Sequence, residues 1–372
     1  MIVVILAVVL MVTLLAIMIE DQHIFVRRLS NQKVSEQGYH YAQGVNAWAA
    51  RVLNDDQNRQ IDHLDEKWAK FGRPEQDDDF QGAGERDSFS LDRSTERARE
   101  EAAEEEEEEF IDFGIDGLEY SIDDLQGRFN LNNLAVQEPQ AAANQKRIFI
   151  NLLEILEIGE FDQRENLYGA LVDWIDENDL SRPNGFESGD YSAKSTPYHA
   201  ADQKLTSLGE LRFVEGFSQE IINELKPYVA VLPVETARIN INTTSEQVLA
   251  SLNLSTVADL GSVSNFLSLR LEPGFQGFTE TETAKSAILG ASPASRGIVE
   301  SMMQTNSQFF QINAKITLGD YVYCMRSVVL REGASQDPEA ATTPKVSVLS
   351  REHNTLCEDQ SPTISSSDED LS

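Results

Sequence analysis

The residues of this chain best suited to chemistry are five carboxylates in one short stretch: Asp173, Asp176, Asp179, Glu187 and Asp190. Asp173 and Asp176 lie three residues apart at the expected end of a helix, so both side chains can point the same way. The other three follow in a loop that contains glycine and proline and could fold back toward them. Hard oxygen ligands in a flexible loop suit Ca²⁺, which takes about six to eight of them. The stretch therefore predicts a calcium site.

The spacing of these carboxylates does not match an EF-hand. Counted from Asp176, Glu187 falls at the twelfth position, but the sixth position, where an EF-hand requires glycine, is Ser181. The alternative to a metal site is a solvated acidic helix end, because the chain has 63 acidic and 30 basic residues and a formal net charge of −33. The residues alone leave both interpretations open.

No other set of residues suggests catalysis. The histidines show no ligand spacing, and no arrangement of serine, cysteine and histidine indicates a nucleophile, so we expect a protein that is not an enzyme. His199, close to Asp202 in sequence, is interpreted as a hydrogen-bonding loop residue. The segment from Leu205 to Val231 resembles a helix-hairpin-helix, but Glu215 and Glu220 lie where phosphate recognition would need basic residues. This feature and the net charge argue against nucleic acid as a partner.

The N-terminal segment is apolar enough to lie in a membrane. Met1 to Ile19 contains no charged side chain, and a helix of this length spans about 28 Å, close to the hydrocarbon thickness of a bilayer. A cleaved signal peptide would need a basic N-terminal region and a small-residue cleavage site, and neither is present. We therefore expect a retained transmembrane segment over residues 1–20, with everything after it on one side of the membrane.

The same helix is predicted to continue beyond the membrane. Tyr41, Val45, Trp48 and Val52 follow one another at steps of four and three, which places them on one helix face. No proline interrupts residues 1–53. The pattern predicts one helix of about fifty residues, whose second half packs against a folded domain through these four side chains.

Strand patterns occur at two places far apart in the sequence. Residues 118–123 and residues 310–318 alternate apolar and polar side chains, and after a turn at Gly319-Asp320 a second β-rich run covers residues 321–330. Between them, residues 140–305 are expected to form almost wholly short helices. Periodic patterns or capping boxes support the helices at 146–156, 164–175, 207–214, 219–228 and after Thr244. The sequence thus predicts an α+β fold with a helical block inserted between early and late strands.

Three further features are predicted from composition. The acidic run Glu104–Glu109 should lie in a solvated low-complexity loop at about 75–109. Residues 333–372, rich in Ser, Thr, Pro and acid, are expected to be disordered. Cys324 lies in an apolar run and Cys357 in that polar tail, so a structural disulfide between them is not expected.

Five stretches carry a resemblance to a known family. An apolar N-terminal helix that continues into an amphipathic one and then strands resembles type IV pilins and pseudopilins, and the large helical insertion resembles the K-type minor pseudopilin of type II secretion systems. The matching stretches, in order, are Tyr41–Trp48, Leu125–Leu134, Leu171–Asp179, Leu225–Val229 and Ile239–Thr243. The resemblance covers roughly residues 1 to 332.

The resemblance implies a fold and its domains. It implies a long pilin-like helix packed on an antiparallel sheet, in a domain formed by residues 21–126 and 306–332. A large all-α domain of SAM or helix-hairpin-helix type, residues 127–305, would be inserted between the strands. The family's inserted domain binds calcium, which supports the five carboxylates as ligands. The chain would be a single-pass inner-membrane protein with its bulk in the periplasm.

The resemblance also implies partners and a role. Members lie at the tip of the pseudopilus, nucleate its assembly and support export of folded proteins across the outer membrane. Their partners are other minor pseudopilins in a heterotrimeric tip, the major pseudopilin and the inner-membrane secretion platform. The chain departs from the pattern of pseudopilins in general at two points. It shows no basic leader, and residues 1–19 contain no glutamate, which is typical of the K-type. The alternatives are a minor pilin of a type IV pilus and, more distantly, a membrane-anchored Ca²⁺-dependent periplasmic hydrolase.

Overall fold

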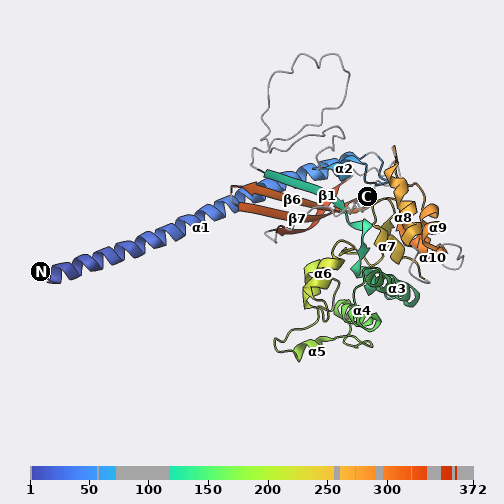
Figure 1. Cartoon of the computed structure of the whole chain (residues 1–372), viewed down its shortest axis with the longest axis horizontal. Coiled ribbons are helices and arrows are strands. Elements are labelled where there is room, and N and C mark those ends of the chain that lie inside the picture. Colours follow the sequence, from blue (N-terminus) through green and yellow to red (C-terminus); the bar gives the residue numbers. More distant parts are fainter. Residues whose placement is uncertain are drawn as a thin grey trace, which may run out of the picture.

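The computed structural model covers residues 1–372 and describes residues 2–56, 58–72, 117–254, 260–272, 274–289, 296–319, 321–332, 345–353 and 357. The predicted acidic loop at 75–109 lies outside the described residues, as do Met1 and most of the predicted tail. Figure 1 shows a long helix, a sheet beside the C-terminal part of this helix, and a group of short helices on the far side of the sheet from the N-terminus.

The long helix is α1 (Ile2–Asp55), 54 residues without interruption. Its N-terminal part projects away from the body and its C-terminal part lies along the sheet (Figure 1). Among the described residues, no helix combines the length and the apolar composition of a membrane span. Several side chains of Met1–Ile19 lie outside the described part of the chain, and the anchor stays a prediction.

Four strands form one antiparallel sheet in the order β1 (Gly117–Asp124), β6 (Phe309–Leu318), β7 (Tyr321–Arg331) and β8 (Val346–His353). The register of β1 against β6 runs from Gly117 opposite Thr317 to Asp124 opposite Phe310. Because side chains alternate between the faces of a strand, one face carries the apolar residues. That inner face packs on α1 through Ile122, Ile312, Ala314, Ile316, Tyr323, Met325 and Val329.

The predicted stripe on α1 lies in this contact. Val45 is fully buried, and Tyr41, Trp48 and Val52 are half-buried against the same core. The Trp48 ring lies 4.7 Å from the Phe71 ring and 5.4 Å from the Tyr120 ring, centroid to centroid. Nearer the N-terminus, Gly38 allows a close approach, since a Cβ there would lie 2.6 Å from two atoms of Tyr323.

The segment between β1 and β6 forms the inserted block, with its own apolar core. It begins with η1 (Leu125–Gly127), β2 (Phe129–Asn130), η2 (Leu131–Ala135), α3 (Pro139–Ile155), α4 (Phe161–Ile175), α5 (Ser188–Ser192), η3 (Leu208–Phe213), α6 (Gln219–Leu225), β3 (Val229–Ala230) and β4 (Ile239–Asn240). It continues with α7 (Glu246–Ser251), α8 (Leu260–Ser268), η4 (Leu269–Leu271), α9 (Glu282–Leu289), α10 (Arg296–Ser301) and β5 (Met303–Gln304). A short helix, α2 (Lys67–Lys70), lies between α1 and β1.

The expectation of an all-α block is corrected by two small parallel pairs, β2 with β3 and β4 with β5. Each pair joins segments far apart in sequence, and the short strands satisfy backbone groups that the flanking helices leave unpaired. The capping box at Ser207 and Glu210 is present, but the helix predicted after Thr244 has Ser245 as its N-cap, one residue later. Ser245 accepts a hydrogen bond from the Val248 backbone amide.

Two sequence expectations for the C-terminal region are wrong. Residues 346–353 are not disordered but form β8. This strand pairs with the edge of β7, whose backbone N–H and C=O groups on that side would otherwise have no strand to pair with. Cys324 and Cys357 form a disulfide, with their Cα atoms 5.6 Å apart. Their contrasting sequence settings were misleading because β8 carries the polar tail back to the strand that contains Cys324.

Candidate metal centre

The predicted carboxylates gather around the end of α4 and the start of α5. Asp173 lies in the last turn of α4 and is completely buried, and Asp176 is the C-cap residue, with 3% of its surface exposed. Glu187 is the N-cap residue of α5 and is 5% exposed. Helix α4 begins at Phe161 and presents its apolar residues to the block core, which fixes the carboxyl end of the helix and hence both aspartates.

A basic residue, Arg182, forms ion pairs with both aspartates of the helix end. Its Nη1 donates to Asp173 Oδ1 at 2.8 Å and also to Asp176, while its backbone amide donates to Asp173 Oδ2 at 3.1 Å. Both carboxylates therefore point the same way, as their three-residue spacing predicts. The sequence analysis expected them to face a cation, and the structure supplies the guanidinium of Arg182 at this place.

The tight loop around Arg182 depends on Gly185. A Cβ at Gly185 would lie 1.7 Å from Asp173 Oδ2, so no larger residue fits without displacing that carboxylate. The preceding Asn184 has a left-handed backbone, φ 64°, a conformation that asparagine tolerates better than most residues. The local sequence thus turns the chain back from the helix end and places Glu187 beside it.

A second group of carboxylates forms the open part of the centre. Asp179, Glu187 and Asp202 each offer an oxygen, and these oxygens lie within 4.8 Å of one another. Neither carboxylate oxygen of Glu187 has a hydrogen-bond partner, although both are buried, and Oδ1 of Asp202 is buried and unpartnered as well. Buried polar atoms are costly without partners, and three such oxygens in one place are suited to act as ligands to a cation.

Electrostatics favour the same conclusion. The pKa of Glu187 is raised to about 7, first by burial and then by the negative charges of Asp173, Asp176, Asp202 and Asp179. A carboxyl group in such surroundings ionises more readily when a cation or hydrogen-bond donors lie beside it. The donor set consists of carboxylate oxygens, without described sulfur or nitrogen ligands in the cluster, and therefore fits a hard divalent cation such as Ca²⁺ better than zinc.

The structure thus divides the five predicted residues. Asp179 and Glu187 belong to the open cluster, while Asp173 and Asp176 lie close by and hold Arg182. Asp190 is not part of the cluster; its Oδ2 accepts a hydrogen bond from the Glu187 backbone amide at 3.0 Å and so fixes the start of α5.

Sequence reasoning missed Asp202 as a member of the cluster. Asp202 has a left-handed backbone, φ 49°, and its amide donates to the Trp174 carbonyl at 3.1 Å, which brings a distant loop to the end of α4. No spacing rule links residues 26 positions apart, the distance from Asp176 to Asp202. The acidic side chain was visible in the sequence, but nothing local indicated that its loop returns to the end of α4.

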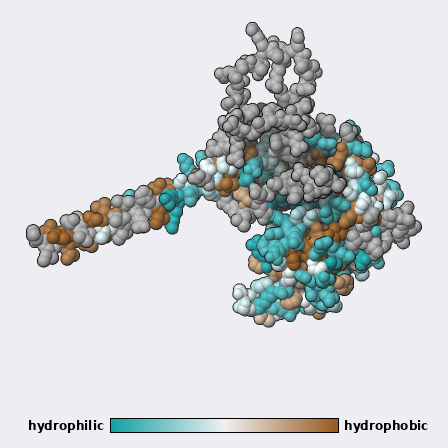
Figure 2. All heavy atoms as spheres, in the orientation of Figure 1, coloured by the Kyte–Doolittle hydropathy of each residue, from teal (hydrophilic) through white to brown (hydrophobic). Residues whose placement is uncertain are grey.

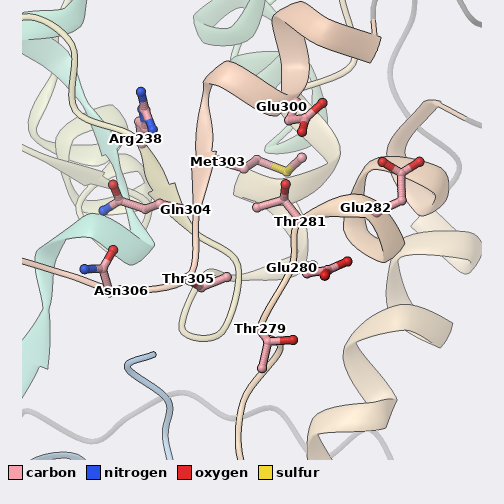
Figure 3. A pocket seen from close by; sticks show the side chains of 10 residues that line it. All are labelled: Arg238, Thr279, Glu280, Thr281, Glu282, Glu300, Met303, Gln304, Thr305 and Asn306. Carbon is pink, nitrogen blue, oxygen red and sulfur yellow. The ribbon is translucent and has the colours of Figure 1, made fainter. Parts of the chain in front are cut away.

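The described residues also line a pocket of about 490 Å³ between β4, β5, α9 and α10. Figure 3 shows its ten lining residues, with residues 279–282 and Glu300 on one side and residues 303–306 near Arg238 on the other. Lys285 pairs with Glu282 and, at 2.9 Å, with Glu300, so two of the three lining glutamates share one cation.

Comparisons with known proteins agree with this architecture. Residues 127–234 match the family described as "Type II secretion system (T2SS), protein K". The chain is similar to the type II secretion system protein K of Pseudomonas aeruginosa, at 28% identity over 310 residues, which are 80% of this chain and 78% of the relative. It is also similar to that of Pectobacterium carotovorum subsp. carotovorum, at 28% identity over 232 residues, 59% of this chain and 69% of the relative.

The fold has a solved counterpart. One chain of the GspK–GspI–GspJ complex from the type 2 secretion system of enterotoxigenic Escherichia coli matches with a TM-score of 0.64 and 22% identity, over 88% of this chain and 99% of that one. The matched family region, residues 127–234, includes the candidate metal centre. The chain belongs to the type II secretion system protein K family, the K-type minor pseudopilins.

Proposed function

We propose that this minor pseudopilin lies at the tip of the type II secretion pseudopilus, where it nucleates pseudopilus assembly and supports export of folded proteins from the periplasm across the outer membrane. The proposal rests on the contrast between the two parts of α1. Its C-terminal part is buried against the sheet, and its N-terminal part projects with large apolar side chains exposed, among them Leu10, Phe25 and Leu29. An exposed apolar stripe of this length marks a surface made for lipid or for other helices.

The same division supports a place in the membrane. Figure 2 shows hydrophobic side chains along the described surface of the projecting part of α1 and a hydrophilic band closer to the body. We propose that residues 1–20 anchor the chain in the inner membrane before they transfer into the pseudopilus. The bulk of the chain would then be periplasmic, and the Cys324–Cys357 disulfide supports this placement, since disulfides persist in oxidising compartments.

The partners are proposed from the solved complex and from the exposed helix. The related GspK is found with GspI and GspJ, so we infer that two other minor pseudopilins pack on the projecting part of α1. The major pseudopilin and the inner-membrane secretion platform would meet the tip complex from the membrane side. The block and the sheet leave that part of α1 uncovered, which is what a helix bundle with other subunits requires.

Calcium is proposed as a structural cofactor. Asp179, Glu187 and Asp202 would hold the ion, which would offset their mutual repulsion and join the loop between α4 and α5 to the loop after α5. The role of the chain is then mechanical and not enzymatic. The relatives are components of a secretion apparatus, and the carboxylates of the centre lie among residues that stabilise the block.

The proposed function is tested by a double variant, Phe25→Asp/Leu29→Asp, on the projecting part of α1, where the two side chains are 66% and 56% exposed. A matched control is Leu180→Asp, 78% exposed on the inserted block. In a strain that lacks its own protein K, the double variant should fail to restore secretion and should not copurify with the other minor pseudopilins. Wild-type secretion by the double variant would contradict the proposal.

Two further measurements separate the alternatives. A strain that loses surface pili but not secretion when the gene is deleted would favour the type IV pilus alternative. A reporter that is active only in the periplasm, fused after Gln60, should be active. An inactive fusion that is stably expressed would exclude the proposed topology.

A further inference from the structure

The last strand and the disulfide form one continuous feature at the edge of the sheet. β8 pairs with β7 from His353 opposite Met325 to Val346 opposite Arg331, with an irregularity between Val328 and Val329. Four residues beyond the end of β8, Cys357 is bonded to Cys324 of β7, which encloses a sequence separation of 33 residues. We call β8 together with Cys357 the strap. One end of the strap is therefore held by a covalent bond.

One side chain of the strap reaches the inserted block. Glu352, opposite Arg326 in the register, forms an ion pair with it, Nη1 to Oε2, at 3.6 Å. Its other oxygen, Oε1, accepts a hydrogen bond of 2.8 Å from Ser207 Oγ. Ser207 is the N-cap residue of η3, so Glu352 connects β7, β8 and the start of a helix in the block.

The surroundings of Glu352 explain why a negative charge is favoured there. Lys226, at the end of α6, has its pKa lowered to about 8, first by burial and then by the positive charges of Arg326 and Arg128, while Glu352 acts in the opposite direction. In a chain with a net charge of −33, this junction is locally basic. The carboxylate of Glu352 offsets part of this positive charge, at the place where η3 and α6 meet the sheet.

Apart from its pairing with β7 and the packing of Val346 on the core under α1, the strap is largely exposed. It is an edge strand of eight residues, and Val348 and Leu349 are 41% and 43% exposed. Short exposed edge strands open readily because few buried contacts protect their hydrogen bonds. The covalent bond lies just past the end of the strap at which Glu352 is found, where it opposes such opening.

We propose that the strap is an oxidation-dependent lock that fixes the inserted block against the outer face of the sheet. When the two thiols close, the S–S bond forms, and two electrons and two protons pass to a disulfide-bearing oxidant, which leaves as a dithiol. The chain is then a substrate for thiol oxidation before it becomes competent as a rigid subunit. In the reduced chain the strap opens, Glu352 leaves Ser207, and η3 and α6 lose a contact with the sheet.

The test is amide hydrogen exchange of the full chain in detergent, read by mass spectrometry, with alkylation of free thiols to confirm the oxidation state. Reduction by a phosphine should accelerate exchange in β8 and in residues 325–331 by at least about tenfold. It should accelerate exchange in η3 and α6 by about three- to tenfold. Residues 148–153, in the core of the block, serve as the internal reference and should not change.

A variant separates the lock from general unfolding. Glu352→Ala keeps the disulfide but removes the acceptor for Ser207 Oγ, so β8 should stay protected while exchange in η3 and α6 accelerates. Glu119→Ala removes an exposed carboxylate paired with Lys315 on the sheet and is the matched control, with no effect expected in η3 or α6. If η3 and α6 exchange at the wild-type rate in oxidised Glu352→Ala, the strap does not fix the block, whatever reduction does.

Discussion

Asp62 and Arg331 form a buried ion pair between the segment after α1 and the last residue of β7. Nη2 of Arg331 lies 2.6 Å from Asp62 Oδ1 and 2.5 Å from Oδ2, and it also donates to the Ser307 carbonyl at 2.8 Å. Asp62 is completely buried and Arg331 is 2% exposed. The pair joins residues 269 positions apart and lies where the long helix, the sheet and the entrance to the inserted block meet.

Replacing Arg331 by Met should destabilise the protein strongly, because it leaves the buried Asp62 carboxylate without its cation. The expected loss is about 3 to 5 kcal/mol in the free energy of unfolding. Adding Asp62→Asn to Arg331→Met removes the unpaired charge and should recover part of the loss. Chemical denaturation of both variants measures this coupling, and equal losses would mean that the charge itself is unimportant.

Trp48 is the largest side chain of the α1 stripe and is half-buried between the Phe71 and Tyr120 rings. Trp48→Ala should lower the free energy of unfolding by about 2 to 3 kcal/mol, somewhat less than for a fully buried tryptophan. Phe161→Ala, on a ring that is 64% exposed, is the control and should change little. Equal thermal stability of the two variants would show that the stripe does not contribute to the core.

Millimolar Ca²⁺ should raise the melting temperature of the full-length chain, and a chelator should lower it. The expected gain is about 2.7 kcal/mol at a hundredfold excess over the dissociation constant. Mg²⁺ should substitute poorly because it demands stricter octahedral geometry. Asp202→Asn should lose most of the response, whereas Glu177→Gln, an exposed carboxylate of the loop that contains Asp179, should keep it. A response that survives Asp202→Asn would place the ion elsewhere.

The centre should also make stability depend on pH. The pKa of Glu187 is raised to about 7 from an ordinary value of 4.5, so the metal-free fold binds a proton that the unfolded chain has already lost between those values. Its contribution to stability is therefore complete below about pH 4.5 and is lost as the pH rises through about 7. Calcium needs the ionised form, so the calcium-induced rise in melting temperature should grow from pH 6 to pH 8. Glu187→Gln should abolish both trends.

Gly185→Ala tests the geometry of the loop beside the centre. The added methyl would collide with Asp173, so we expect a loss of about 1 to 3 kcal/mol, together with a weaker calcium response. Gly189→Ala is the matched control, since nothing lies within 4 Å of a Cβ at that position in α5. Thermal melts with and without calcium distinguish the two. An unchanged Gly185→Ala protein would mean that the loop relaxes easily.

Local patterns predicted the elements well because their periodicity reports directly which face is buried. The strand alternation placed β1, β6 and β7 to within a residue or two, and the steps of four and three placed Val45 in the core. The insertion between β1 and β6 was also predictable, since helical patterns separate two strand patterns. Residue types near α4 predicted Asp179 and Glu187 as ligands, and the structure brings these two carboxylates together.

What the sequence did not reveal depends on contacts between distant segments. Arg182 is next to the predicted ligands in sequence, but only the turn at Gly185 shows that it pairs with Asp173. Asp202 reaches the cluster through a backbone contact with Trp174, which has no local signature. The disulfide and β8 were missed for the same reason, since a polar strand at a sheet edge is recognisable only when its neighbour is known.

The insertion also determines the order in which the protein can fold. β1 and β6 are neighbours in the sheet, yet Gly117 pairs with Thr317 across the whole inserted block. During synthesis β1 must remain without this partner until the block has been made, and closing so long a loop is slow when the loop is flexible. A block that has already formed its own core brings its two ends together and shortens the search. The sheet, and with it the surface on which α1 packs, is therefore completed last.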